Sequence, residues 1–398
     1  KKGMVMNMNN KNWVSVWGNA VSIAEHHPEA YAKYITLRYP VYIPFAGDTL
    51  RFTFDNYCGS EAVTVTRATV SAATSPVYEK MPLACPCKKE TICDITFSKN
   101  ESVTMEAHQT AVSDPVSFPV KKGMTLTVSL YFADFTLMQS AVLVTGPLSK
   151  GFFSLGDQTH ADALPMDTTK TTNWFYFLSN IELMTAEENH TVICYGDSIT
   201  AGAWPDYLTL LARQNPDNHT AFIRRATSGS RVLRQYECIT YDSYGLKGTN
   251  RFPHEIPTTG ADTVIIQQGI NDIIHPVGIE TNPFRPMSDL PTAKELIDGY
   301  RYYIEEAKKL HLKVYMGTLL PIFGWRTYAT FRDDLRNELN AWIRSAKEID
   351  GCIDFDLALR GEDNPSAFRE GFDSGDHLHP SSKAYKAMAE CAYEVLRK

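Results

Sequence analysis

Val192–Ile199, which reads Val-Ile-Cys-Tyr-Gly-Asp-Ser-Ile, decides the fold of the second half of the chain. Its first four residues form the kind of apolar run that makes a buried strand, and the segment from Trp204 onward has helical character. The glycine and aspartate between them supply a tight turn. A serine in such a turn, here Ser198, is well placed to expose its hydroxyl as a nucleophile.

The alternation of strands and helices continues to the C-terminus. Strands are predicted at 191–195, 220–224, 263–268, 313–318 and 352–354. Helices are predicted at 205–214, 290–310, 330–348 and 381–396. This rhythm predicts an α/β fold in three layers, a parallel sheet with helices on both faces. In such sheets the active site lies at the carboxyl ends of the strands.

Residues 1–185 have a different rhythm, in which short segments such as Leu50–Phe54 and Leu126–Phe132 alternate apolar and polar residues. This pattern predicts an antiparallel β-sandwich. We interpret 1–185 as a jelly-roll-like accessory domain and 186–398 as the catalytic domain. Turns or loops are expected at Gly47-Asp48, Lys121–Gly123 and 147–173, and a closing strand at Trp174–Leu178.

Charge and hydropathy exclude several classes of protein. The net charge of −7 leaves no basic footprint, so nucleic acid is not an expected partner. No apolar run reaches the ~18 residues that a membrane-spanning helix needs. Lys1–Asn9 lacks the apolar core of a secretory signal, which predicts a cytoplasmic bacterial protein; processing of the N-terminus would instead imply secretion. Exposed sandwich edges invite pairing, so a homo-oligomer is an alternative to a monomer.

The eight cysteines and eleven histidines suggest no cofactor. Cys85-Pro86-Cys87 with Cys93 is reminiscent of a zinc site, but no fourth ligand follows at the usual spacing. A loop with free thiols is the favoured interpretation. We therefore predict that the protein uses neither a metal nor an organic cofactor.

A carboxylate and an imidazole near the C-terminus complete a catalytic set with Ser198. A serine hydroxyl is a weak nucleophile until a base takes its proton. His379 is the predicted base, and Asp376 would orient it and stabilise its charge. Two alternatives compete: Ser198 as a helix N-cap, and the neighbouring His377 as the base.

Acyl transfer also needs hydrogen-bond donors for the oxyanion of the tetrahedral intermediate. Gly229, after the second predicted strand, could offer an unobstructed backbone N–H. Asn271, after the third, could donate through its side-chain amide. The alternative is that Asn271 and Asp272 are plain turn residues, and we expect a structural role for Asp272.

These four segments, in this order, resemble the blocks of the SGNH hydrolase family, also called GDSL hydrolases. The resemblance implies Ser198 as nucleophile, Asp376 and His379 as its partners, and an oxyanion hole formed by Ser198, Gly229 and Asn271. The residues that flank these blocks resemble those of a bacterial branch of the family that has a β-rich N-terminal domain. The stretch Ser113-Asp114-Pro115-Val116 also resembles a stretch in the N-terminal region of that branch. These flanking segments are Trp204–Leu208, Ser230–Leu233, Tyr300-Arg301 and Phe372–Pro380. The segment between Ser198 and Trp204 is very short, so we expect a substrate-contacting loop to be missing on the leaving-group side of the pocket.

Substrate contacts are expected from Trp325, Arg231 and His377, whereas Trp17 and Trp204 are expected in the core. Trp325 lies in a turn after the fourth strand and would form a wall of the pocket. Alternatively, Arg231 pairs with a carboxylate near the site. His377 could likewise face solvent and not contact the substrate.

The sequence thus predicts a serine esterase that acts on a small-molecule or oligosaccharide ester. The family resemblance allows acetyl-sugars, short acyl esters, lysophospholipids and thioesters, and the absence of a long apolar lid segment favours short acyl groups, above all O-acetyl on carbohydrate. The first alternative is a lipase or lysophospholipase that takes longer acyl chains. A second is a carbohydrate-binding protein on a hydrolase scaffold that has lost catalysis, which would require a missing triad member.

Overall fold

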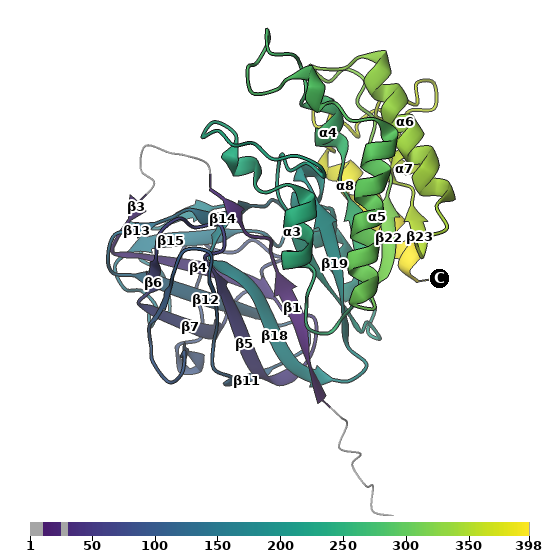
Figure 1. The fold of residues 1–398 in the computed structure, drawn as a ribbon. Helices are drawn as coiled ribbons and strands as arrows, with labels where there is room; N and C mark the ends of the chain where they lie inside the picture. The colour runs from purple at the N-terminus through teal and green to yellow at the C-terminus, as the bar shows by residue number, and fades with distance from the viewer. Residues whose placement is uncertain (1–10, 25–30, 398) are drawn as a thin grey trace, which may run out of the picture.

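The computed structural model describes residues 11–24 and 31–397. The segment Lys1–Asn9, on which the expected localisation depends, lies outside these residues. Figure 1 shows a β-rich half beside a half in which helices flank a sheet. The antiparallel and the parallel parts of the predicted fold are both confirmed.

The β-rich half contains two larger antiparallel sheets. One has the order β1 (Lys11–Gly18), β18 (Leu178–Ala186), β5 (Gly47–Asp55) and β10 (Thr110–Val112), with β11 (Val116–Val120) also paired to β5. The other has the order β16 (Lys170–Thr172), β15 (Gly151–Leu155), β4 (Ile35–Tyr42), β12 (Thr125–Phe132), β7 (Arg67–Ala72) and β8 (Cys93–Ile95). Buried side chains from both sheets, such as Phe52 and Leu130, share one core, as expected for a sandwich.

Short strands complete this half. They are β13 (Thr136–Leu137) with β3 (Tyr31–Ala32), β6 (Val63–Val65) with β9 (Val103–Met105), and the group β17 (Trp174–Tyr176), β14 (Ser140–Leu143) and β2 (Ser22–Ile23). A 3-10 turn covers Lys89–Thr91.

Three local predictions for this half are wrong. The expected loop 147–173 contains β15 and β16, which pair with each other and extend the sheet beyond β4. Gly47 does not form a turn but begins β5. The expected closing strand at Trp174–Leu178 breaks at Phe177, whose φ of 61° is incompatible with a strand, so β17 ends and β18 begins there.

The second half is a parallel sheet with the order β20 (Thr220–Ala226), β19 (His190–Gly196), β21 (Ala261–Gln267), β22 (Lys313–Gly317) and β23 (Gly351–Ile353). The first strand, β19, lies between the second and the third, so the strand order reverses beside it. Ligands of open α/β sheets bind outside the carboxyl ends of the strands at such a switch point. Ser198 therefore stands where this topology places a site.

Helices form the outer layers of this half. They are α1 (Ser198–Ala201), α2 (Trp204–Arg213), α3 (Gly248–Glu255), α4 (Ile270–Ile274), α5 (Ala293–Lys309), α6 (Thr330–Ser345), α7 (Phe355–Leu359) and α8 (Ser382–Leu396), with 3-10 turns at Asp242–Tyr244 and Met287–Asp289. α2 and α7 pack against α8, while α3 and α6 pack against α5. Helix α5 begins at Ala293, later than predicted, because Thr292 and Glu295 form a capping box.

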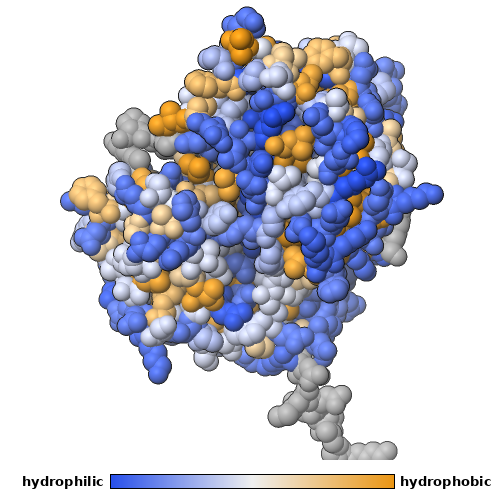
Figure 2. Space-filling model, viewed as in Figure 1, coloured by the Kyte–Doolittle hydropathy of each residue, from blue (hydrophilic) through white to orange (hydrophobic). Residues whose placement is uncertain are grey.

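Within residues 11–24 and 31–397, none of the helices has the length and hydropathy that a membrane-spanning helix needs. Figure 2 shows a face on which hydrophilic residues predominate and apolar residues occur in small separate groups.

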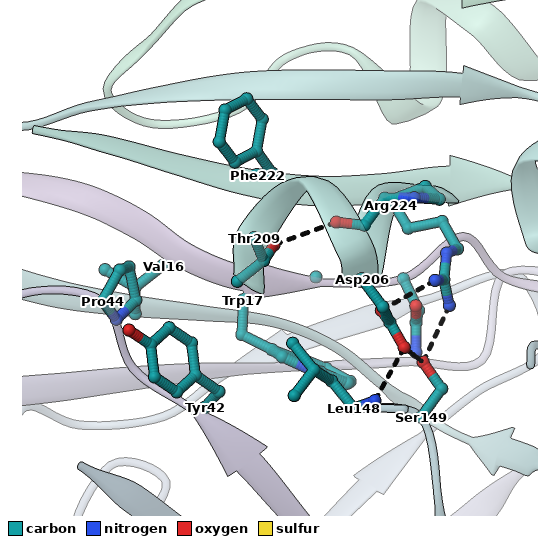
Figure 3. Close-up of a pocket in the computed structure, with 13 residues that line it drawn as sticks. Val16, Trp17, Tyr42, Pro44, Leu148, Ser149, Asp206, Thr209, Phe222 and Arg224 are labelled. Atoms are coloured by element: carbon teal, nitrogen blue, oxygen red, sulfur yellow. Dashed lines mark hydrogen bonds and ion pairs between the residues drawn. The ribbon is translucent and has the colours of Figure 1, made fainter. Parts of the chain in front are cut away.

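The two halves meet along β1 and β20. At this contact the guanidinium of Arg224 on β20 donates to Asp206 of α2 at 2.8 Å and to Ser149 of the β-rich half at 2.9 Å. Figure 3 shows this buried ion pair at the edge of a small pocket that Trp17 and Tyr42 also line. Because Asp206 and Arg224 are both hydrogen-bonded to Ser149 of the β-rich half, this ion pair ties the two halves together at the contact. The domain division after residue 185 stays a prediction.

Candidate active site

The turn after β19 presents Ser198. Asp197, not Ser198, caps helix α1, because its side chain accepts a hydrogen bond from the Ile199 N–H at 3.0 Å. The N-cap alternative for Ser198 is therefore wrong, and its hydroxyl is free to face other groups. Gly196 is required in this turn because a Cβ there would lie 2.3 Å from the carbonyl oxygen of Gln267. Burial raises the pKa of Asp197 to about 7, against the hydrogen bond from Ile199.

The structure brings Ser198, His379 and Asp376 together from opposite ends of the domain. The His379 Nε2 atom lies 2.9 Å from Ser198 Oγ, and its Nδ1 atom lies 2.6 Å from Asp376 Oδ2. The other carboxylate oxygen of Asp376 accepts hydrogen bonds from the backbone N–H groups of Leu378 and His379, at 2.9 and 2.8 Å. A serine, an imidazole and a carboxylate in this chain of contacts have the geometry of a catalytic triad.

The ionised state of Asp376 determines which imidazole nitrogen carries the proton. Partial burial raises the pKa of Asp376, but hydrogen bonds from the His379 ring and from backbone N–H groups outweigh it and lower the pKa to about 2. Because a carboxylate can only accept, the Nδ1 atom of His379 holds the hydrogen. Nε2 is then left to accept from the Ser198 hydroxyl, which is the state that a general base needs.

We expect part of the folding stability to depend on Asp376 in acid. Its folded pKa, about 2, lies below the ordinary value of 3.8, so the unfolded chain binds a proton first as the pH falls. The stabilisation is complete above about pH 4 and is lost as the pH falls toward 2. Urea unfolding of wild type and Asp376→Asn should thus give a stability difference that is constant from pH 7 to 5 and shrinks toward pH 3. A difference independent of pH over the whole range would contradict this assignment.

The loops after β20 and β21 carry the expected oxyanion donors. Gly196 of β19 pairs with Ala226 of β20 on one side and with Gln267 of β21 on the other, so the three strands end side by side. Gly229 follows β20 in a turn with φ of 77°. Asn271 is buried in α4 and donates from Nδ2 to the carbonyl oxygen of Ser230 at 3.0 Å. The bond fixes the Asn271 amide against the Gly229 turn, and a second amide hydrogen is left for a ligand.

Asp272 has the structural role that we expected. Its carboxylate accepts hydrogen bonds from the backbone N–H groups of Val232 and Leu233 at 2.8 and 3.1 Å. Burial raises its pKa to about 6, and these hydrogen bonds oppose the rise. Asp272 thereby ties α4 to the segment that follows Gly229.

Arg251, which sequence reasoning missed, braces the same loops. Its buried guanidinium donates to the carbonyl oxygens of Gly196 and Arg225, at 3.0 and 3.1 Å, where β19 and β20 end. It also donates to Ser230 Oγ at 3.0 Å and forms an ion pair with Glu255 at 3.0 Å. Arg251 thus links the strand that carries the nucleophile to the loop that carries an oxyanion donor. No local pattern in α3 signals this role, since the partners lie far apart in sequence.

Comparison with known families agrees with this geometry. Residues 194–387 match the profile described as the GDSL-like Lipase/Acylhydrolase family. This part of the chain belongs to that family. The GDSL-like domain is thereby an ester hydrolase, and the resemblance inferred from the four sequence blocks is confirmed.

Solved structures similar to the chain align with about half of it. A GDSL-like lipase from Bacteroides thetaiotaomicron is 20% identical, with 53% of this chain and 89% of that chain covered and a TM-score of 0.38. A catalytic mutant of an acetylxylan esterase from Geobacillus stearothermophilus is 17% identical, with 52% and 93% covered and a TM-score of 0.39. TesA is 16% identical, with 52% and 98% covered and a TM-score of 0.38. Among curated proteins no match is found.

The three residues predicted to contact the substrate differ from one another in burial and in hydrogen-bond partners. Arg231 is buried and pairs with Asp289 at 3.1 Å, which corresponds to the alternative interpretation, and its charge is not free for a substrate. His377 is exposed, and its Nδ1 atom lies 2.5 Å from Asp373. Trp325 is half-buried against the core of the domain. Contacts of His377 and Trp325 with substrate stay predictions.

The turn that carries Trp325 nevertheless borders the triad loop. A Cβ on Gly324 would lie 2.7 Å from the His377 ring, two residues before His379. Phe323, beside it, is 47% exposed and packs edge-on against Tyr328. Phe323 therefore offers an exposed aromatic face near the triad that sequence reasoning did not select.

The remaining predictions concern the core and metals. Trp204 is fully buried, as expected, whereas Trp17 is only half-buried at the contact between the halves. Cys85 and Cys87 are buried. Within residues 11–24 and 31–397, no group of three or more histidine, cysteine, aspartate or glutamate side chains is arranged to hold a metal ion.

Proposed function

We propose that this ester hydrolase removes short acyl groups, above all acetyl, from carbohydrate. The exposure of the catalytic side chains carries the proposal: the His379 and Asp376 side chains are 33% and 42% exposed. A triad this close to the surface is accessible to an ester on a bulky, hydrated alcohol. It also provides little apolar burial along which a long acyl chain could be stabilised.

The proposed reaction follows from the positions of the side chains. Ser198 Oγ attacks the ester carbonyl carbon while its proton passes to His379 Nε2. The N–H groups of Ser198 and Gly229 and the Asn271 amide stabilise the oxyanion. The intermediate collapses to an acyl-serine, and the alcohol leaves with the proton from His379. His379 then takes a proton from water, which attacks the acyl-serine, and returns that proton to Ser198 Oγ as the carboxylic acid is released.

Side chains around the triad support a carbohydrate as the alcohol. Sugar rings stack on aromatic faces and hydrogen-bond with polar side chains through their hydroxyls. Phe323 provides an exposed aromatic face, and the His377–Asp373 pair provides polar groups on the triad loop itself.

One observation favours the alternative of an acylhydrolase for longer chains. The segment after α4 exposes three large apolar side chains, those of Ile279, Phe284 and Met287, which are 61%, 47% and 41% exposed. Apolar side chains on a loop near a site are a typical feature of surfaces that bind lipid. The acyl-chain preference of the enzyme discriminates the two functions.

We expect a series of p-nitrophenyl esters, from acetate to decanoate, to give the highest kcat/KM within the short acyl groups, acetate to butyrate, and a fall from hexanoate onward. Matched hydrolysis by Ser198→Ala gives the background for each ester. The reason is that a methylene is worth about 0.8 kcal/mol only when it is buried, and an open triad offers no long apolar surface to bury the methylenes of a long chain. A maximum at octanoate or beyond would reject the proposed function in favour of the acylhydrolase alternative.

A further inference from the structure

A small cavity of ≈ 40 Å³ lies where the β-rich half meets the oxyanion loop. Ile23 of β2, Val142 of β14 and Trp174 of β17 form its wall on the β-rich side. Ser228 and Tyr244 form the wall on the side of the hydrolase domain. Its lining therefore requires both halves of the chain.

The cavity adjoins the groups that would hold the reacting carbonyl. Ser228 directly precedes Gly229, and a Cβ on Gly229 would lie 2.3 Å from the Tyr244 ring. Two residues after the end of β14, the backbone N–H of Thr145 donates to the carbonyl oxygen of Ala201 at 3.0 Å. Ala201 ends the short helix α1 that Ser198 begins. The cavity wall is thus attached to both the oxyanion loop and the helix of the nucleophile.

The size and lining of the cavity limit what can occupy it. Its volume corresponds to about three water-sized spaces, which matches an acyl group of roughly two to four carbons. Isoleucine, valine and aromatic side chains form much of the wall. One buried hydroxyl, Thr227 Oγ1, has no hydrogen-bond partner among the described residues. A short acyl group leaves room for a water that can hydrogen-bond with this hydroxyl, whereas a long alkyl chain would fill the cavity and leave the hydroxyl without a partner.

We propose that this cavity receives the acyl group of the ester, and that the β-rich half thereby sets the upper limit on acyl length. The proposal rests on the proposed function and deepens it. Gly229, whose N–H would bind the carbonyl oxygen, directly follows Ser228 of the cavity wall, and consecutive Cα atoms lie about 3.8 Å apart. Val142 and Ile23 are then the residues that determine specificity.

The test changes the cavity from the β-rich side, away from the triad. Val142→Ala removes two methyl groups from the wall, and Ile23→Trp fills the space from a half-buried position that tolerates a larger ring. Each buried methylene corresponds to a factor of about four in kcat/KM. We expect the hexanoate-to-acetate ratio of kcat/KM to rise about tenfold in Val142→Ala, and the butyrate-to-acetate ratio to fall about tenfold in Ile23→Trp.

Val144→Ala is the matched control. Val144 lies two residues after Val142 and is buried as Val142 is, but it does not line the cavity. Ratios within one variant cancel any loss of folded enzyme. Unchanged ratios in both cavity variants, with a wild type that still prefers acyl groups of two to four carbons, would overturn this inference and leave the proposed function intact. An equal shift in Val144→Ala would overturn it as well. A wild type that prefers octanoate would reject the proposed function itself.

Discussion

Replacing Ser198 by alanine should lower kcat by about 10⁴- to 10⁶-fold, with the fold preserved. The change removes the oxygen that attacks the ester, and the remaining imidazole and carboxylate have no nucleophile to activate. Ser198 does not cap α1, since Asp197 does, so the helix keeps its N-terminal hydrogen bond in the variant. The loss of activity should therefore appear without a change in thermal unfolding. Steady-state hydrolysis of p-nitrophenyl acetate measures the first effect, and circular dichroism on heating measures the second.

A covalent label separates the nucleophile from a residue that only supports it. An organophosphate that phosphorylates activated serines should add its mass to the wild type at the peptide that contains Ser198, and should add nothing to Ser198→Ala. Ser345→Ala, an exposed serine on α6, is the control and should label as the wild type does. Labelling of Ser198→Ala at another serine, or turnover within tenfold of the wild type, would move the nucleophile elsewhere.

The site was predictable because its signals are local. Each of Ser198, Gly229 and Asn271 follows an apolar run by a few residues, and parallel strands bring such loops together at one edge of the sheet. The spacing of Asp376 and His379 is likewise visible within one segment. The structure adds the distances between these residues, which sequence spacing does not supply.

What sequence reasoning missed depends on contacts between distant segments. Strand β15 has no clear local signal because its five residues lie among glycines and threonines, and pairing with β4 and β16 makes it a strand. Arg251 has no local signal because its acceptors lie on two strands and a loop. The cavity beside Tyr244 exists only where the two halves of the chain meet.

Replacing Asn271 by alanine should lower kcat by about 10²- to 10³-fold with little change in KM. The amide acts on the negative charge that develops on the carbonyl oxygen, and this charge is absent from the bound ester, so the loss should fall on the transition state. Asn271 also donates to the carbonyl oxygen of Ser230, and the variant leaves that buried acceptor without this donor. A stability loss of about 1–3 kcal/mol should accompany the kinetic effect.

A second buried asparagine separates these two effects. Asn340 lies on helix α6. Its Nδ2 atom donates to the carbonyl oxygen of Leu319 at 2.8 Å, and its Oδ1 atom accepts from the Leu319 N–H at 2.7 Å. Asn340→Ala should therefore reproduce the stability loss while kcat per folded molecule stays within about twofold of the wild type. If Asn271→Ala lowers kcat no more than Asn340→Ala does, the Asn271 amide supports the loop and does not bind the oxyanion. A kinetic loss confined to Asn271→Ala assigns that amide to the transition state, because both variants remove the same chemical group from an equally buried position.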